Sequence, residues 1–234
     1  MMTLMMLAVT LATAQDASQD AMPQDVAPMI ERTQSHEIRY GRSDGVNTWE
    51  AGPYSGTWSG RASSMNVMNV RRRNATRTQL TVNGPGFEDG TVSLSCAGGE
   101  SEFELFWITW DRQQLSYVCT ISRNGEPIES RLELAFQRGR GFLGAGRNER
   151  AGQMVHEGQT VQFETQRLSG IAFPSGKVPG YVVRADGREI AGMDYGVMRS
   201  TLYLPAEDDP YREIALLTTI ALATFFDPAN MPGN

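Results

Sequence analysis

The sequence has few of the residues on which enzymes most often depend. Its 234 residues include two histidines and two cysteines, and Lys177 is the one lysine. A zinc ion takes three or four His, Cys or carboxylate ligands, and two isolated histidines do not supply such a set. We therefore assign no catalytic residue, no metal ligand and no cofactor from the sequence, and an enzyme is the less favoured interpretation.

Two partial matches to functional motifs lack their necessary context. The segment 139–144 fits Gly-x-Gly-x-x-Gly, but that fingerprint needs a strand before it and a helix after it, whereas strand-rich sequence surrounds it here. His156 is followed by Glu157 and Gly158, without the second histidine of a zincin helix. We expect a flexible glycine loop at 139–144, and we expect His36 and His156 to lie on the surface or in loops.

Positive charge is concentrated at one place in the sequence. The 27 acidic and 21 basic residues leave a net charge of −6, and such a balance does not favour nucleic acid as a partner. Arg71, Arg72 and Arg73, with Arg77 nearby, form the one dense basic patch. This patch is a candidate for binding an anionic ligand. The alternative is a solvated loop or edge strand that its charges protect from association.

The apolar runs are too short to span a bilayer, which takes about 20 residues. One of them, residues 1–14, ends in Ala-Thr-Ala, the small-x-small pattern that precedes a signal-peptidase cut. We predict a signal peptide over residues 1–14, cleavage after Ala14, and a periplasmic or secreted protein. Residues 15–37 begin with Gln-Asp repeated among Ala, Ser and Pro, and we predict a disordered linker because this composition has little to bury.

The two cysteines are Cys96 and Cys119. In an exported protein such a pair is expected to form a disulfide, because nothing outside the cytoplasm keeps thiols reduced. If strands at 91–95, 102–110 and 115–122 formed a meander, the cysteines would lie two strands apart, about 9.6 Å, and a disulfide cannot bridge that distance. We therefore expect Cys96 to lie in a loop that folds over the end of the sheet.

Most of the chain after the linker alternates between apolar and polar residues with period 2, which is typical of strands. Asn124-Gly125 and Asp186-Gly187 separate alternating runs and predict two tight hairpins, since both turn positions need a positive φ. About ten strand candidates, with 159–165 and 200–204 among them, favour a closed antiparallel β-barrel, because closure removes exposed edges. We predict one mostly β domain over residues 38–234.

One helix is predicted near the C-terminal end of this domain. Asp209 is suited to cap it and Pro210 fits its first turn, so we expect a helix over 210–226. From Ile214 to Phe226 no residue is charged, and no polar stripe is left to face water. A helix that is apolar all round is either a membrane span or enclosed by protein, and at about 20 Å this one is too short for a bilayer core of about 30 Å. We expect the barrel to enclose it.

A β-rich domain that ends in one wholly apolar helix resembles the tubby C-terminal-like superfamily, which includes tubby, the phospholipid scramblases and the LURP-one-related proteins. The segment 181–194, YVVRADGREIAGMD, is similar to a hairpin of that family, and strand 200–204 and the terminal helix follow in the family's order. The resemblance implies a closed barrel around a hydrophobic helix. It also implies a non-enzymatic envelope module whose basic surface, here Arg71–Arg73 and Arg77, binds anionic lipid or a protein.

A second resemblance indicates a different class of protein. Gly56-Thr57-Trp58 is similar to the Gly-x-Trp signature of the lipocalins, which are exported, disulfide-bonded barrels that carry an apolar ligand in the barrel mouth. Their helix is amphipathic and packs outside the barrel, unlike the helix expected over 210–226. The alternative function is therefore a lipocalin-like carrier of a small apolar ligand, with an open cavity.

The predicted signal peptide can be tested directly. N-terminal sequencing of the protein recovered outside the cytoplasm is expected to begin at Gln15, because the peptidase cuts after the small-x-small pattern. An exported form that still starts at Met1 would contradict the prediction.

Overall fold

The computed structural model describes residues 28–67, 71–87, 89–99, 116–138, 148–168, 178–196 and 199–225. In chain order the elements are α1 (Met29–Arg32), β1 (Gln34–Glu37), β2 (Arg39–Ser43), β3 (Val46–Ala51), β4 (Tyr54–Val67), β5 (Arg71–Val82), β6 (Val92–Gly99), β7 (Ser116–Arg123), β8 (Glu126–Arg138), β9 (Asn148–His156), β10 (Gln159–Thr165), β11 (Gly180–Ala185), β12 (Arg188–Tyr195), β13 (Ser200–Leu204) and α2 (Arg212–Ala223).

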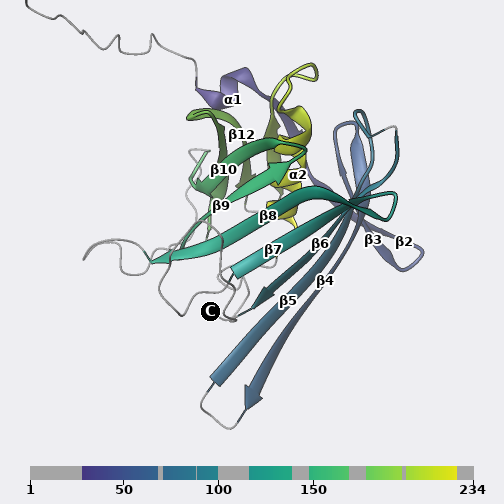
Figure 1. The fold of residues 1–234 in the computed structure, drawn as a ribbon, viewed down its shortest axis with the longest axis vertical. Coiled ribbons are helices and arrows are strands. Elements are labelled where there is room, and N and C mark those ends of the chain that lie inside the picture. The colour runs from purple at the N-terminus through teal and green to yellow at the C-terminus, as the bar shows by residue number, and fades with distance from the viewer. Residues whose placement is uncertain are drawn as a thin grey trace, which may run out of the picture.

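The strands form one antiparallel sheet that curls into a nearly closed barrel (Figure 1). Each of β2 to β12 pairs with the next strand along the chain, and β13 pairs on its other side with β1. β1 and β2 are separated by Ile38 alone, whose N–H donates to the Ser200 carbonyl at 2.8 Å. One short stretch of chain thus bonds to both edges of the sheet. The predicted mostly β barrel is confirmed.

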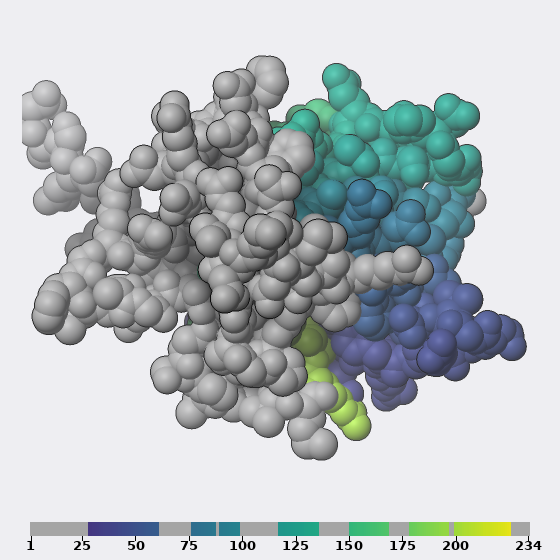
Figure 2. All heavy atoms as spheres, turned by 90° about the horizontal axis from the view of Figure 1, so that it is seen from below, coloured from purple at the N-terminus to yellow at the C-terminus, as the bar shows by residue number. Residues whose placement is uncertain are grey.

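The order of the strands is visible from the end of the barrel as well. In Figure 2, bands of colour succeed one another across one face from teal through blue to purple, which follows the chain backwards from the middle strands to the first. This is the arrangement that a meander produces, since each strand then lies beside its neighbour in sequence.

Both predicted hairpin turns are confirmed. Asn124-Gly125 and Asp186-Gly187 join β7 to β8 and β11 to β12, and all four residues have positive φ. The same backbone conformation occurs at Asp44-Gly45 and Glu157-Gly158, which the sequence analysis did not identify as turns. Glu157 is the unusual member of the set, because glutamate adopts positive φ less readily than Asn or Asp does.

α2 forms the centre of the core, as the sequence predicted. Figure 1 shows it with β8, β9 and β10 crossing in front of it, and it also contacts β11, β12 and β13. Its residues from Ile214 to Ala223 are all buried, so no side of the helix faces water. Thr218 and Thr219 are tolerated in this apolar setting because each hydroxyl donates to the carbonyl four residues earlier, at 2.6 and 2.8 Å.

The predicted limits of this helix, 210 and 226, need correction at the start. The helix begins at Arg212 rather than Pro210, because Asp209 does not cap it directly. The Asp209 carboxylate instead accepts the N–H of Tyr211 at 2.8 Å, which makes a local turn ahead of the first helical residue. The last helical residue is Ala223, and position 226 lies outside the described residues.

Cys96 and Cys119 form the predicted disulfide, but the prediction that Cys96 lies in a loop is wrong. β6 pairs directly with β7, and the two cysteines face each other in that register with their Cα atoms 3.9 Å apart. The predicted strand at 102–110 lies outside the described residues. The bond points into the barrel, since both side chains belong to the buried core.

The predicted linker, residues 15–37, extended too far. Residues 29–37 are folded: α1 packs on β12, and β1 pairs with β13. The sequence Gln-Ser-His-Glu of β1 carries no apolar alternation, because the strand is held by its backbone bonds to β13 rather than by a buried face. Residues 15–27 lie outside the described part of the chain.

The Gly-x-Trp segment has a local explanation in this fold. Gly56 lies opposite Trp49 in the register of β3 and β4, and the Trp49 indole N–H donates to the Thr81 carbonyl at 3.1 Å. A Cβ at Gly56 would lie 1.8 Å from that carbonyl oxygen, so only glycine permits the close approach.

The central position of α2 predicts a large effect of a buried charge. Ile220→Asp places an unpaired carboxylate in the core, and we expect it to cost more than about 4 kcal/mol of unfolding free energy, enough to prevent folding. Val46→Asp adds the same charge at an exposed position of β3 and is expected to change stability by less than about 0.5 kcal/mol.

Urea unfolding followed by circular dichroism measures both variants. A chain that stops after Asp209 should likewise fail to fold. If that truncated chain were soluble, cooperative in its unfolding and β-rich, α2 would not be the core of the fold.

Candidate functional site

The N-terminal end of α2 lies at a particular end of the barrel. Because successive hairpins alternate between the ends of an antiparallel meander, the connections β3–β4, β5–β6, β7–β8, β9–β10 and β11–β12 share one end. β13 also leads into α2 there. We call this the tight-turn end. Two groups of polar side chains gather at it, one on each side of the first turn of α2.

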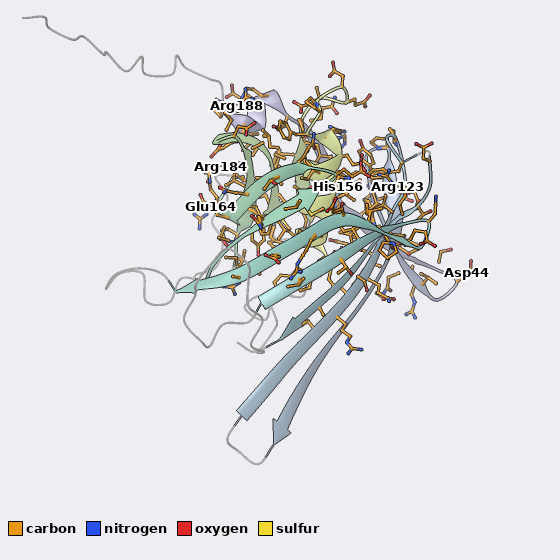
Figure 3. The ribbon with its side chains drawn as sticks, viewed as in Figure 1. Asp44, Arg123, His156, Glu164, Arg184 and Arg188 are labelled. Atoms are coloured by element: carbon orange, nitrogen blue, oxygen red, sulfur yellow. A yellow bond between two sulfur atoms is a disulfide. The ribbon has the colours of Figure 1, made fainter. Side chains whose placement is uncertain are left out.

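The first group is centred on His156, the last residue of β9. Its Nδ1 lies 2.7 Å from the hydroxyl of Ser130 in β8, and its Nε2 lies 2.9 Å from a carboxylate oxygen of Glu213 in α2. The Arg123 guanidinium donates to the same Glu213 oxygen at 3.0 Å and lies 3.2 Å from the Glu157 carboxylate. Figure 3 shows His156 and Arg123 close together beside α2.

The expectation that His156 lies on the surface or in a loop is wrong. The residue is 2% exposed, and its partners come from positions 26 and 57 residues away in sequence. A buried imidazole needs partners for both nitrogens, and Ser130 and Glu213 supply them. The sequence offered no sign of this group, since no spacing rule connects residues on three separate elements.

The His156 group contains the atoms of a metal site and of a catalytic triad, but its geometry favours a structural role. One ligand atom from each of His156, Glu157 and Glu213 lies within 4.8 Å of the others. Arg123 contacts both carboxylates, so its guanidinium already supplies the positive charge that they need. Ser130 has the contact of a serine nucleophile with its base, yet it is buried, and a nucleophile must meet its substrate.

The second group is centred on Arg212, the first residue of α2. Its Nε donates to the Tyr54 hydroxyl at 3.0 Å, its Nη1 donates to the Pro205 carbonyl, and its Nη2 lies 3.4 Å from Nε2 of His36. The guanidinium carbon also lies 5.4 Å from the centre of the Tyr54 ring, within the range of a cation–π contact.

His36 is half-buried in β1 rather than fully exposed, and its surroundings disfavour its charged form. Burial lowers its pKa below 6.5, the positive charge of Arg212 lowers it further, and Glu207 acts in the opposite direction. The ring lies close against Gly52, where an added Cβ would come within 2.3 Å of Nδ1. Gly52 has a φ of +60°, so both its backbone and the neighbouring ring require glycine.

The predicted basic patch lies on the β4–β5 hairpin. Arg71, Arg72 and Arg73 open β5 and pair in register with the last residues of β4. The pairing of β5 with β6 begins only at Ala75, and Figure 1 shows the two long strands projecting beyond the rest of the sheet. Arg77 is exposed and faces Arg61 directly across the two strands. The structure thus places a fifth arginine on this hairpin, which the sequence analysis did not select.

The segment 139–144 lies outside the described residues. Neither helix in the described part of the chain is long and apolar enough to cross a membrane. No family model, no curated protein and no solved structure matches the chain.

The His156 group predicts a stability difference. His156→Ala removes the partner of the buried Ser130 hydroxyl and leaves the Glu213 carboxylate with Arg123, and we expect it to cost about 2 to 4 kcal/mol of unfolding free energy. As a control, Glu164→Ala removes a carboxylate that is 53% exposed and paired with Arg184, on a different flank of the barrel in Figure 3. That change is expected to cost less than about 1 kcal/mol.

Chemical denaturation of both variants gives the comparison. Equal losses of unfolding free energy in His156→Ala and Glu164→Ala would mean that the His156 group does not hold α2 in place.

Proposed function

We propose that the protein is a non-enzymatic, exported envelope module of the tubby-like type, and that it binds anionic envelope lipid through the β4–β5 hairpin. The observation that carries this proposal is the position of α2. A helix buried on every side fills the space between the strands, so binding falls to the surface of the molecule. A periplasmic or secreted location, with the signal peptide removed, would bring that surface to the envelope.

The filled interior counts against the alternative of a lipocalin-like carrier. A carrier keeps an open cavity and packs its helix outside the barrel, whereas α2 contacts β9 to β13 from within. The glycine of the Gly-x-Trp segment, Gly56, is accounted for by the hydrogen bond of Trp49 to Thr81, which a Cβ at position 56 would block. Neither the enclosed position of α2 nor the glycine at position 56 requires a ligand.

The β4–β5 hairpin supports the choice of an anionic partner. Arg61 and Arg77 occupy directly opposed positions, and like charges so placed destabilise a strand pair. Arg71, Arg72 and Arg73 add three more positive charges on the part of β5 that precedes its pairing with β6. A phosphate-bearing membrane surface would offset this repulsion, and basic residues gain about 1 kcal/mol each near such a surface.

Co-sedimentation with lipid vesicles tests the proposal. The protein is expected to bind phosphatidylglycerol vesicles and not phosphatidylcholine vesicles, and to be released by salt. The triple variant Arg71→Gln, Arg72→Gln, Arg73→Gln should bind about 100-fold more weakly, since three contributions of about 1 kcal/mol are lost.

A matched control removes the same charge elsewhere. The variant Arg39→Gln, Arg42→Gln, Arg188→Gln changes three exposed arginines away from the β4–β5 hairpin and should bind nearly as well as the wild type. Equal losses in the two triple variants would show a response to net charge alone. Absence of vesicle binding by the wild type would overturn the lipid proposal and leave a protein partner as the next candidate.

A further inference from the structure

Among the described residues, the Arg212 guanidinium of the second polar group forms no ion pair with a carboxylate. Arg212 is 6% exposed, and a guanidinium stays protonated in proteins. Its partners are neutral: the hydroxyl and ring of Tyr54, the Pro205 carbonyl, and the imidazole of His36. Buried charges are normally paired, because removing an unpaired charge from water is costly. The arrangement has the cation of an ion pair without its anion.

The hydrogen-bonding capacity of Arg212 indicates what kind of anion fits. A guanidinium has five N–H donors, and the three contacts to Tyr54, Pro205 and His36 use one on each nitrogen. One further N–H remains on Nη1 and one on Nη2. Two free N–H donors on one guanidinium can bind two oxygens of a carboxylate or phosphate.

We propose that Arg212, with His36 and Tyr54, forms a binding site at the tight-turn end for a small soluble oxyanion, a molecule that presents a carboxylate or phosphate group. The site lies at the start of β4, at the opposite end of that strand from the residues paired with Arg71, Arg72 and Arg73, and it does not depend on lipid binding there. Arg212 would donate both remaining N–H groups to the ligand. His36, which is less buried than Arg212, would lie on the side from which the ligand enters.

His36 is placed to respond to such a ligand. Its Nε2 faces Arg212, and Gly52 leaves room for the ring on its other side. The charged groups around the ring are Arg212 and Glu207, which act on its pKa in opposite directions. Glu37, the next residue of β1, is paired with Arg199. A bound anion would favour the imidazolium, so the pKa of His36 should rise on binding.

The sign of the pH dependence follows from this linkage. Below the pKa of His36 the site carries two positive charges, and above it the site carries one. The anion should therefore bind more tightly at low pH, with the gain lost as the pH rises through the pKa of His36 in the complex.

Sulfate and acetate are suitable probes, because sulfate stays fully ionised across the range used and acetate presents a carboxylate. We expect both ions, at constant ionic strength set with chloride, to shift the ¹⁵N signals of the His36 ring and Arg212 Nε in a saturable way. Sulfate should bind at least about tenfold more tightly at pH 5 than at pH 8, the effect of one added charged hydrogen bond.

Variants separate binding from a purely structural role of Arg212. Arg212→Lys keeps the charge but loses the paired donors, and it should weaken sulfate binding at least about tenfold. His36→Gln should retain binding and lose its pH dependence. Arg188→Gln changes an exposed arginine near the tight-turn end, and it should leave sulfate binding and its pH dependence unchanged. If Arg212→Lys fails to fold, the titration of the wild type with sulfate and the pH dependence of sulfate binding by His36→Gln still test the proposal.

Three outcomes would overturn the proposal. The first is that neither ion shifts the His36 or Arg212 signals of the wild type, in which case Arg212 only braces the start of α2. The second is that Arg212→Lys folds and binds sulfate as tightly as the wild type. The third is that phosphatidylglycerol vesicles shift the His36 signal while sulfate and acetate do not, because the anion would then be a lipid headgroup.

Discussion

A helix enclosed in a barrel must have its polar backbone ends satisfied without bulk water, and much of this structure is organised by that requirement. At the C-terminal end of α2, the Tyr195 and Tyr40 hydroxyls donate to the carbonyls of Leu222 and Ala223 at 2.6 and 3.2 Å. At the N-terminal end, Asp209 accepts the N–H groups of Tyr211 and Arg212. Tyr195 lies on β12 and Tyr40 on β2, which are far apart in the order of the strands, so the helix also joins distant parts of the sheet.

The structure contains arginines in two different environments, one exposed to water and one buried beside α2. Arg77 of the β4–β5 hairpin is exposed on the outside of the sheet, where water screens its charge and a large anionic surface can approach. Arg212 lies beside the first turn of α2 at low exposure, where its field is screened less and only a small group can approach. The two arginines therefore differ in how strongly they attract an anion and in the size of the anion that can approach, although their side chains are identical.

The local signals in the sequence predicted those parts of the fold that short-range physics determines. The turns at 124–125 and 186–187 follow from residues that tolerate positive φ, and strands 159–165 and 200–204 were predicted with their observed limits. The absence of polar residues in the C-terminal helix was enough to predict its enclosure.

The candidate sites could not be predicted in the same way, because they depend on contacts across the barrel. His156 was assigned to the surface since its partners, Ser130 and Glu213, lie on other elements. Arg212 looks in the sequence like an ordinary charged residue of a first helical turn. β1 was assigned to the linker because its stability comes from backbone pairing with β13, which leaves no mark in side-chain periodicity. The error over Cys96 came from placing a predicted strand at 102–110 between the two strands that carry the cysteines, whereas β6 pairs directly with β7.

The position of the disulfide constrains the order in which the molecule is assembled. Cys96 and Cys119 are 4% and 0% exposed and point into the core that α2 completes, with Phe225 stacked at 4.3 Å on the neighbouring Tyr117 ring. An oxidising enzyme cannot enter a packed interior, so it must act while the barrel is still open. α2 follows both cysteines in the chain, so the cysteines are synthesised well before it. Synthesis from the N-terminus thus leaves an interval in which the two thiols are accessible, and docking of the helix ends that interval.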